Sequence, residues 1–341
     1  MAAYTAIDDP EAYFQAKTYT GNASTQSLTL DGDTDLQPDL LWIKCRSSIE
    51  FPTWVDSVRG DSAENTGYYY FQTHATDAEQ AHAGNTLVDA ITSDGFNIGN
   101  NDQVNLSSGT FVAWAWKESA TAGLDIITWA GNETQKDISH NLSAIPHWII
   151  VKVRGTAKQW TCYHHKMTAD PDNAGIFLQS TAAPTTGTAG YFGNTAPTSS
   201  VFTVGTSTNV NQDGDNVMGY CWTNVQGFSK FGAYSGNGDA DGPFIYLGFK
   251  PAFFMLKNTT NASSEWRIYD NKRDTFNEVD NNLQPHVSDV EASSGDMDFC
   301  SNGVKIRSTD GNVNQDGYTM IYMAWAESPF VNSEGVPTTA R

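Results

Sequence analysis

The chain contains a repeated hexapeptide whose residue types suit a calcium ion. NVNQDG occurs at Asn209–Gly214 and again at Asn312–Gly317, and its Asn-x-Asn-x-Asp-Gly pattern matches the first half of a calcium-binding loop. Such a loop needs a glutamate at its twelfth position, where the two copies have Tyr220 and Met323. The alternative is a strand-joining turn, because Asp-Gly readily adopts the positive φ of a tight hairpin. The missing glutamate favours the turn, and we expect no metal at either copy.

A second candidate for metal binding is the run CYHH, which contains Cys162, His164 and His165. Adjacent side chains on a strand point to opposite faces, so the two histidines cannot hold one ion without a bend. A structural zinc site also needs further ligands, and the sequence has no second cluster of this kind. We therefore expect neither a metal nor another cofactor.

Hydrolytic chemistry would require paired carboxylates, or a nucleophile with a histidine base. The motifs GxSxG and HExxH are absent, and Asp and Glu are scattered over segments that read as turns. This distribution is typical of a solvated acidic surface. The sequence therefore predicts a protein that is not an enzyme.

Aromatic side chains are the most suggestive feature for binding. Trp54, Trp160 and Trp266 recur at a regular spacing, which favours a role in core packing. Sugar rings stack on exposed aromatic rings, while Asn and Asp bind hydroxyl groups. The aromatic residues without recurring counterparts, which we take as candidates for a glycan or partner surface, are Tyr68, Tyr70, Trp129 and Tyr191.

The elements that would position these residues come in copies. Four markers recur in the same order at a period of about 105 residues. A glycine ends the strings TYTG, TWAG and AYSG, and a proline precedes the apolar strings DLLWIKC, HWIIVKV and AFFMLKN. A tryptophan follows in TWVD, QWTC and EWRI, and a closing apolar string ends at Trp116, Trp222 and Trp325. The chain is therefore predicted to be three tandem copies of one unit.

Each unit is predicted to consist of strands. In the first copy Leu41, Ile43 and Cys45 share one face of an alternating string. The residue beside them on the opposite face is a lysine in every copy: Lys44, Lys152 and Lys257. This pattern predicts half-buried strands with the lysines in solvent.

The predicted fold class is all-β, with three tandem antiparallel β-sandwich units of about 105 residues each. A jelly-roll or concanavalin-like topology is the first expectation for each unit. The predicted division is 1–120 for the first unit with an N-terminal segment, 121–228 for the second, 229–332 for the third, and 333–341 for an extended tail. Short links between units predict a compact rod or triangle of domains without flexible hinges.

Composition excludes some partners. Lys and Arg total 19 against 39 Asp and Glu, and the net charge of −20 opposes binding to nucleic acid or to an anionic membrane. No apolar run approaches the ~20 residues of a membrane span. The four cysteines form no CxxC pair, and the N-terminus does not resemble a signal peptide. We therefore expect synthesis in a reducing cytoplasm with free thiols.

The C-terminal tail has too few apolar groups to fold alone. Phe330, Val331 and Val336 are its sizeable apolar side chains, and Pro329 and Pro337 oppose a regular helix or a central strand. We expect an extended segment that lies against another chain or the third unit. Phe330 would be its anchor, and the three apolar residues would contribute to assembly.

Several segments together resemble a known family. These are the opening YTAIDDPEAYFQAKTYTGN, the block PDLLWIKCRSS with DSVRG, the segment SDGFNIG with NLSSGTFVAWAWK, and the ending YMAWAESPFVNSEGVPTTAR. They resemble repeat-domain virion and tail-fibre-associated structural proteins of tailed phages of marine and aquatic bacteria. The resemblance covers nearly the whole chain, is most specific at the C-terminus, and is weakest at CYHHK in the middle unit.

This resemblance implies a place in the virion and no catalytic residues. The expected function is that of a tail fibre or receptor-binding component contacting host surface glycan. The alternatives are a capsid decoration protein or head fibre and, third, a polysaccharide depolymerase. The expected partners are other virion proteins, host surface polysaccharide and further copies of the chain, with a homotrimer as the first expectation.

Overall fold

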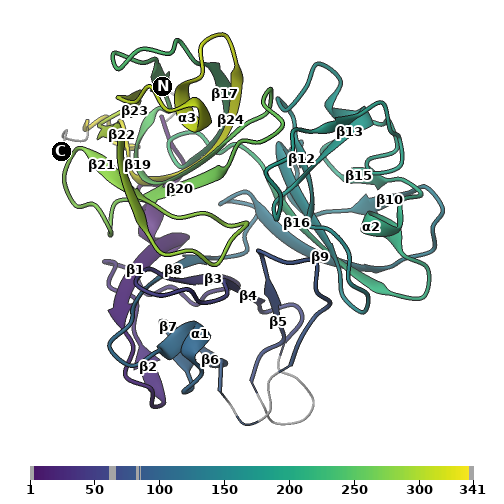
Figure 1. Ribbon diagram of the computed structural model, residues 1–341, viewed down its shortest axis with the longest axis horizontal. Coiled ribbons are helices and arrows are strands. Elements are labelled where there is room, and N and C mark those ends of the chain that lie inside the picture. The colour runs from purple at the N-terminus through teal and green to yellow at the C-terminus, as the bar shows by residue number, and fades with distance from the viewer. Residues whose placement is uncertain (1–3, 61–66, 82–83, 85, 338–341) are drawn as a thin grey trace.

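The computed structural model describes residues 4–60, 67–81, 84 and 86–337 of the chain. Its regular elements are almost all β-strands, and the ribbon forms three lobes that meet at a common centre (Figure 1). We call the strand-bearing parts of the lobes the first segment (14–116), the second segment (124–222) and the third segment (229–329). None of the helices in the described ranges is long and apolar enough to cross a bilayer. The predicted all-β class is confirmed.

The elements of the first segment follow a short 3-10 helix, η1 (Pro10–Ala12). They are β1 (Phe14–Thr20), β2 (Gln26–Leu28), β3 (Leu40–Cys45), β4 (Thr53–Asp56), β5 (Tyr70–Gln72), β6 (Val88–Thr92), β7 (Gly95–Ile98), α1 (Asp102–Asn105) and β8 (Thr110–Trp116).

The second segment contains β9 (Leu124–Ala130), β10 (Lys136–Ser139), β11 (Trp148–Val153), β12 (Thr161–His164), η2 (Pro171–Asn173), β13 (Ala174–Phe177), β14 (Thr185–Thr186), β15 (Val201–Val204), α2 (Thr208–Asn211) and β16 (Asn216–Trp222). The third segment contains β17 (Ser229–Ser235), β18 (Phe244–Tyr246), β19 (Phe249–Asn258), β20 (Trp266–Asp270), β21 (Val279–Asn282), β22 (Ala292–Cys300), β23 (Gly303–Ile306), α3 (Gly311–Asn314) and β24 (Thr319–Pro329).

In each segment the antiparallel sheet that holds the opening and closing strands has the same strand order, and we call it the larger sheet, although both sheets of the third segment have four strands. The orders begin β1-β8-β3-β4 in the first segment, β9-β16-β11-β12 in the second and β17-β24-β19-β20 in the third. The opening strand pairs with the closing strand in the same register each time, because its first residue lies opposite the recurring tryptophan. The three pairs are Phe14 with Trp116, Leu124 with Trp222, and Ser229 with Trp325.

A smaller sheet accompanies each larger one. These sheets have the orders β2-β7-β6, β10-β15 and β18-β23-β22-β21. In the first segment, Leu41 and Ile43 of β3 form one hydrophobic core with Phe96 and Ile98 of β7, so the two sheets enclose it.

The expectation of half-buried strands is wrong. Every residue of β3 is buried, and so is every residue of β11. Leu41 faces the core between the two sheets, whereas Leu40 and Trp42 belong to a larger core shared by all three segments. Both faces of the larger sheets are therefore covered, one by the smaller sheet and one by the neighbouring segments.

The recurring lysines lie at the contacts between segments and not in solvent. Each of the three is 0 % exposed. Lys152 Nζ donates to the carbonyl oxygen of Thr76 at 3.3 Å. Lys257 donates to Thr181 at 3.1 Å, and Lys44 donates to Val287 at 2.8 Å. The lysines thus join the second segment to the first, the third to the second and the first to the third, which closes a ring.

The recurring tryptophans pack as core residues, as predicted, and their packing crosses between segments. Trp54 contacts Trp160 with ring centroids 5.5 Å apart, and Trp148 contacts Trp266 at 6.0 Å. The indole Nε1 of Trp160 donates to the carbonyl oxygen of Gln72 in the first segment at 3.2 Å. Trp266 Nε1 makes the equivalent bond to the second segment. A fully buried N–H group normally has a hydrogen-bond acceptor, and here the acceptor is a carbonyl oxygen of the neighbouring segment.

The two NVNQDG copies do not form hairpins. They overlap α2 and α3, and each joins a strand of the smaller sheet to a strand of the larger sheet. The strand-joining role and the positive φ of Gly214 (76°) and Gly317 (70°) agree with the sequence. The prediction of a hairpin is wrong, because the strands on either side of each copy belong to different sheets.

A buried asparagine explains why this hexapeptide recurs. Asn211 is 0 % exposed, its Oδ1 accepts from the backbone N of Asn132, and its Nδ2 donates to the carbonyl oxygen of Thr134 at 2.7 Å. A Cβ at Gly131 would clash with the carbonyl of Gln212. The backbone at the recurring glycine and the hexapeptide therefore contact each other directly. Asn105 and Asn314 make the same contact in the other segments.

The described part of the C-terminal tail, up to Pro337, turns back on itself, so the extended form predicted for 333–341 is wrong there, and 338–341 lie outside the described residues. Asn332 N donates to the carbonyl oxygen of Val336 at 3.0 Å and closes a tight turn. Phe330 N donates to the carbonyl oxygen of Gly248, which places this residue against the third segment. Ser333 N donates to Asp8 Oδ1 at 2.7 Å. The turn is stable because it bonds to both the third segment and the N-terminal segment.

Candidate functional site

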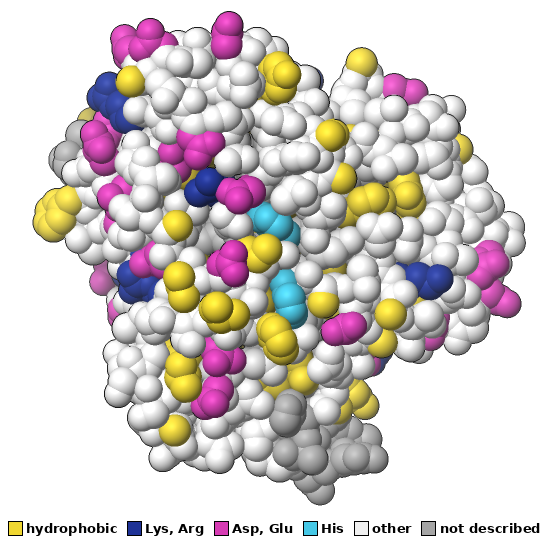
Figure 2. All heavy atoms as spheres, viewed as in Figure 1, with side chains coloured by type: hydrophobic (Ala, Val, Ile, Leu, Met, Phe, Trp, Pro, Cys, Tyr) yellow, Lys and Arg dark blue, Asp and Glu magenta, His cyan; other side chains and the backbone are white. Residues whose placement is uncertain are grey.

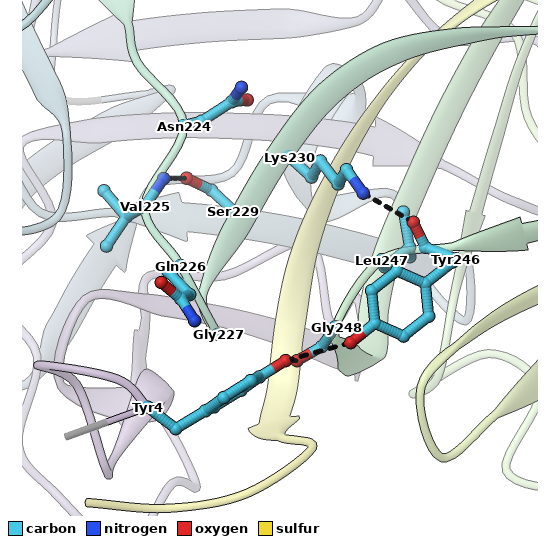
Figure 3. A pocket seen from close by; sticks show the side chains of 10 residues that line it. All are labelled: Tyr4, Asn224, Val225, Gln226, Gly227, Ser229, Lys230, Tyr246, Leu247 and Gly248. Atoms are coloured by element: carbon cyan, nitrogen blue, oxygen red, sulfur yellow. Dashed lines mark hydrogen bonds between the residues drawn. The ribbon is translucent and has the colours of Figure 1, made fainter. Parts of the chain in front are cut away.

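A hollow of about 400 Å³ lies where the link between the second and third segments meets the N-terminal segment (Figure 3). We call it the tyrosine pocket. It is lined by Tyr4, Asn224, Val225, Gln226, Gly227, Ser229, Lys230, Tyr246, Leu247 and Gly248. Its volume falls within the range of ~300–1,000 Å³ that small-molecule sites occupy.

Two tyrosines form one side of the tyrosine pocket. Tyr246 ends β18 and is 50 % exposed, since its neighbour Ile245 takes the inward position of the strand. The Tyr4 hydroxyl donates to the carbonyl oxygen of Gly248 at 2.9 Å and lies 3.3 Å from the Tyr246 hydroxyl. Burial raises the pKa of Tyr4 to about 12. Both rings are therefore held in place, and the Tyr246 ring stays open to a ligand.

A lysine and two amides supply polar groups. Lys230 Nζ lies 5.2 Å from the centroid of the Tyr246 ring and donates to the carbonyl oxygen of Tyr246 at 2.6 Å. Burial lowers the pKa of this lysine. Asn224 and Gln226 are exposed on the link, and in the described part of the chain their side-chain NH₂ groups have no protein acceptor. The pocket thus offers donors beside an aromatic face.

A second hollow of about 570 Å³ adjoins the tyrosine pocket at Asn224. We call it the histidine groove. Its lining residues are Ala144, Ile145, Pro146, His147, Tyr163, His165, Ala196, Pro197, Thr223 and Asn224. They come from the segment before β11, from β12 and the residue that follows it, from the loop before β15, and from the link.

Hydrogen bonds fix the protonation of the histidines in the groove. The backbone N of Asn224 donates to His147 Nδ1 at 3.2 Å, which favours the neutral tautomer with its proton on Nε2, and the Thr223 hydroxyl lies 3.2 Å from the same nitrogen. His165 Nε2 donates to the carbonyl oxygen of Phe231 in the third segment at 3.0 Å. Burial, with the charges of His165 and Lys166, lowers the pKa of His147 to about 4, and burial also lowers that of His165. Both rings are neutral near pH 7.

Neither hollow is lined by a carboxylate within the described residues. This is notable because Asp and Glu side chains are spread over the face of the molecule in Figure 2. A hydrolytic site of the glycosidase kind needs two carboxylates. The described linings of the two hollows therefore do not contain such a pair.

A third hollow does contain two carboxylates. It has a volume of about 270 Å³ and is lined in part by Glu79, Arg154 and Asp215. Glu79 accepts two hydrogen bonds from Arg154, at 2.8 and 2.9 Å, and also pairs with Arg59. Asp215 accepts from the Thr156 hydroxyl. Glu79 thus joins the first and second segments, and both groups are engaged in structural contacts.

The four aromatic residues that the sequence singled out are not brought together. Tyr70 is 2 % exposed and Trp129 is 9 % exposed, so both belong to the interior and not to a surface. Tyr68 and Tyr191 are half-buried. Tyr70 packs in the first segment, and Trp129 packs on Phe202 in the second. The prediction that Tyr70 and Trp129 belong to a glycan or partner surface is therefore wrong.

The candidate metal ligands serve a different purpose. Cys162 is fully buried, and burial raises the pKa of its thiol well above its usual range. His164 is also fully buried, and its Nε2 donates to the carbonyl oxygen of Tyr322 in the third segment at 3.3 Å. No group of three or more Cys, His, Asp and Glu side chains that suits a metal ion occurs among the described residues. All four cysteines are free thiols.

The three tail residues that the sequence predicted to contribute to assembly lie near the tyrosine pocket. Phe330 and Val331 are half-buried, and Val336 is 56 % exposed. Gly248 lines the pocket and accepts from both Tyr4 and Phe330 N. Both ends of the described chain therefore meet beside this site.

Sequence reasoning missed every aromatic residue of the tyrosine pocket. One signal was present at Tyr246, because the string FIY places Phe244 and Tyr246 on the same side of a short strand and Ile245 on the other. Tyr4 carried no signal, since it is 242 positions away from its partner Tyr246.

Comparison with known proteins gives one family match. A family model described as "Domain of unknown function (DUF7483)" matches residues 9–329, which spans all three segments. No curated protein matches the sequence.

Proposed function

Since the chain belongs to the DUF7483 family, whose function is unknown, we propose from its own residues that it is a non-enzymatic structural protein of a tailed-phage virion. It acts as a tail fibre or receptor-binding component that contacts host surface glycan. Each segment is a β-sandwich of jelly-roll or concanavalin-like topology. The resemblance of the sequence to virion proteins supports the location, and the tyrosine pocket supports the activity.

The observation that carries this proposal is the exposed ring of Tyr246 beside Lys230, Asn224 and Gln226 in a pocket without carboxylates. A pyranose ring presents one apolar C–H face and a rim of hydroxyl groups. An aromatic ring packs against the first, and amide and ammonium donors bond to the second. A site of this kind binds sugar without cleaving it.

The experiment has two parts. Peptide mass spectrometry of purified virions should detect the chain, and an array of neutral and uronic-acid-containing bacterial polysaccharides should retain the purified protein. Tyr246→Ala should reduce retention, whereas Phe244→Ala should not, because Phe244 is 47 % exposed on the same strand but lies outside the pocket. Absence from virions, or equal retention of the two variants, would refute the proposal.

The alternative place in the virion is the capsid, as a decoration protein or head fibre. Further copies of the chain are proposed as partners, with a homotrimer first. Density for the chain in whole virions by electron cryomicroscopy separates the two places, and the mass of the purified protein in solution gives its oligomeric state. A depolymerase is the third alternative, and release of reducing ends from the retained polysaccharide would favour it.

A further inference from the structure

We propose that the tyrosine pocket and the histidine groove bind one linear oligosaccharide together, so that the ligand is an internal stretch of a polymer. This inference rests on the proposed glycan-binding function and specifies its ligand class. A pocket for one terminal sugar would need only the tyrosine pocket.

The first argument is continuity. Asn224 lines both hollows, and residues on either side of it in the chain line one hollow each: Thr223 the groove, and Val225 the pocket. Asn224 is exposed, and its Oδ1 accepts from Phe231 N at 2.7 Å, which orients the amide so that its NH₂ remains for a ligand. A chain lying across Asn224 therefore meets both hollows without an obstructing ion pair.

The second argument is the matching chemistry of the two hollows. In the groove, Ile145 is 52 % exposed and offers an apolar surface for a sugar face. The rings of His147 and His165 are perpendicular, at 88° and with centroids 4.6 Å apart. His147 Nε2–H has no protein acceptor among the described residues and faces no carboxylate. It is a donor for a hydroxyl or ring oxygen.

The third argument is charge. The chain carries 39 acidic residues, yet among the described residues the linings of both hollows contain none, and the lining of the tyrosine pocket includes Lys230. The two hollows can therefore bind neutral and anionic polymers alike. The rest of the acidic surface repels anionic polymers. Each hollow has the volume of an independent small-molecule site, so a ligand that fills both is longer than one sugar.

The test uses length. Size-fractionated fragments, from disaccharide to dodecasaccharide, of neutral and uronic-acid-containing bacterial polysaccharides are titrated against the full chain by calorimetry. Affinity should rise with length and reach a plateau once both hollows are filled. Ile145→Ala should weaken the long fragments at least about twofold and leave the disaccharide unchanged, because it removes apolar contact in the groove alone. His147→Gln should act in the same way.

The matched control is Ile49→Ala, which truncates an isoleucine that is 66 % exposed in the first segment, away from both hollows. It should change neither length dependence nor affinity. Equal affinity for all lengths, or an equal loss for short and long fragments in Ile145→Ala, overturns the inference while the proposed function stands. No binding at any length overturns both.

Discussion

The hydroxyl group of Tyr220 in the second segment donates a 2.7 Å hydrogen bond to Oδ2 of Asp56 in the first segment, and both side chains are fully buried. The same carboxylate pairs with Arg59. Trp114 of the first segment makes the equivalent bond to Asp270 of the third at 3.0 Å. A tyrosine and a tryptophan at corresponding positions of β16 and β8 thus reach the next segment's buried carboxylate. The segments are joined by specific polar bonds within an aromatic core.

Tyr220→Phe should lower the free energy of unfolding by about 1.5–3 kcal/mol, because a buried bond to a charged group is lost while the ring remains. Urea unfolding measures this change. Tyr246→Phe serves as the control, since its hydroxyl lies at a half-exposed position. An equal effect of the two substitutions would contradict the account of the segment contact.

Asn211→Ala should destabilise the protein by about 1–3 kcal/mol, since it leaves the backbone N of Asn132 and the carbonyl of Thr134 without their partner. Asn141→Ala, at an exposed asparagine of the same segment, should change the stability by less than about 0.5 kcal/mol. Thermal unfolding followed by circular dichroism compares them. If both variants have the same melting temperature, the recurring asparagine does not stabilise the connection between the two sheets.

Acid should weaken the contact between the second and third segments. Burial lowers the pKa of His147, His164 and His165, so the unfolded chain binds more protons than the folded one below the ordinary histidine pKa. Their contribution is fully present above roughly pH 6.5 and is lost progressively toward the folded pKa, which is about 4 for His147.

The melting temperature of the wild type should therefore fall between roughly pH 7 and pH 5 more steeply than that of His147→Asn. Glu118 acts in the opposite direction, because burial raises its pKa to about 7 and the folded chain keeps that proton. Repeating both melts in a Glu118→Gln background removes this opposing term. Parallel pH profiles of the two proteins would show that His147 has no part in the acid response.

Deleting Ser333–Arg341 should leave the β content intact, since the turn lies outside the sheets. The deletion removes the bond from Ser333 N to Asp8 and also removes Val336, which we propose as an assembly residue. Circular dichroism should be unchanged, while light scattering should show a smaller oligomer. Asp8→Asn is the matched control, because it weakens the same bond and keeps the tail. If the truncated protein forms an oligomer with the same number of chains as the wild type, the tail has no part in assembly.

The sequence predicted the features that recur from one segment to the next. Trp116, Trp222 and Trp325 marked the closing strands because each pairs in the same register with its opening strand. It did not predict the place of Lys44, because a lysine that alternates with apolar residues normally faces water. Its acceptor, Val287, is 243 positions away, and only the ring of segments brings them together.

The site was missed for the same physical reason. Tyr4 and Tyr246 meet through packing of the N-terminal segment on the third segment, and no local pattern reports such a contact. Conversely, Tyr70 and Trp129 were selected because they do not recur, yet burial depends on what covers a residue. Both lie under neighbouring elements that the alternation pattern did not reveal.

The most direct test of glycan binding at the tyrosine pocket is the dissociation constant of one retained bacterial polysaccharide for the wild type, Tyr246→Ala and Phe244→Ala. Loss of an aromatic contact should weaken Tyr246→Ala about two- to tenfold. Phe244→Ala, which removes an equally exposed ring from the same strand, should bind as the wild type does. Equal constants for all three proteins, or a loss confined to Phe244→Ala, would contradict the account.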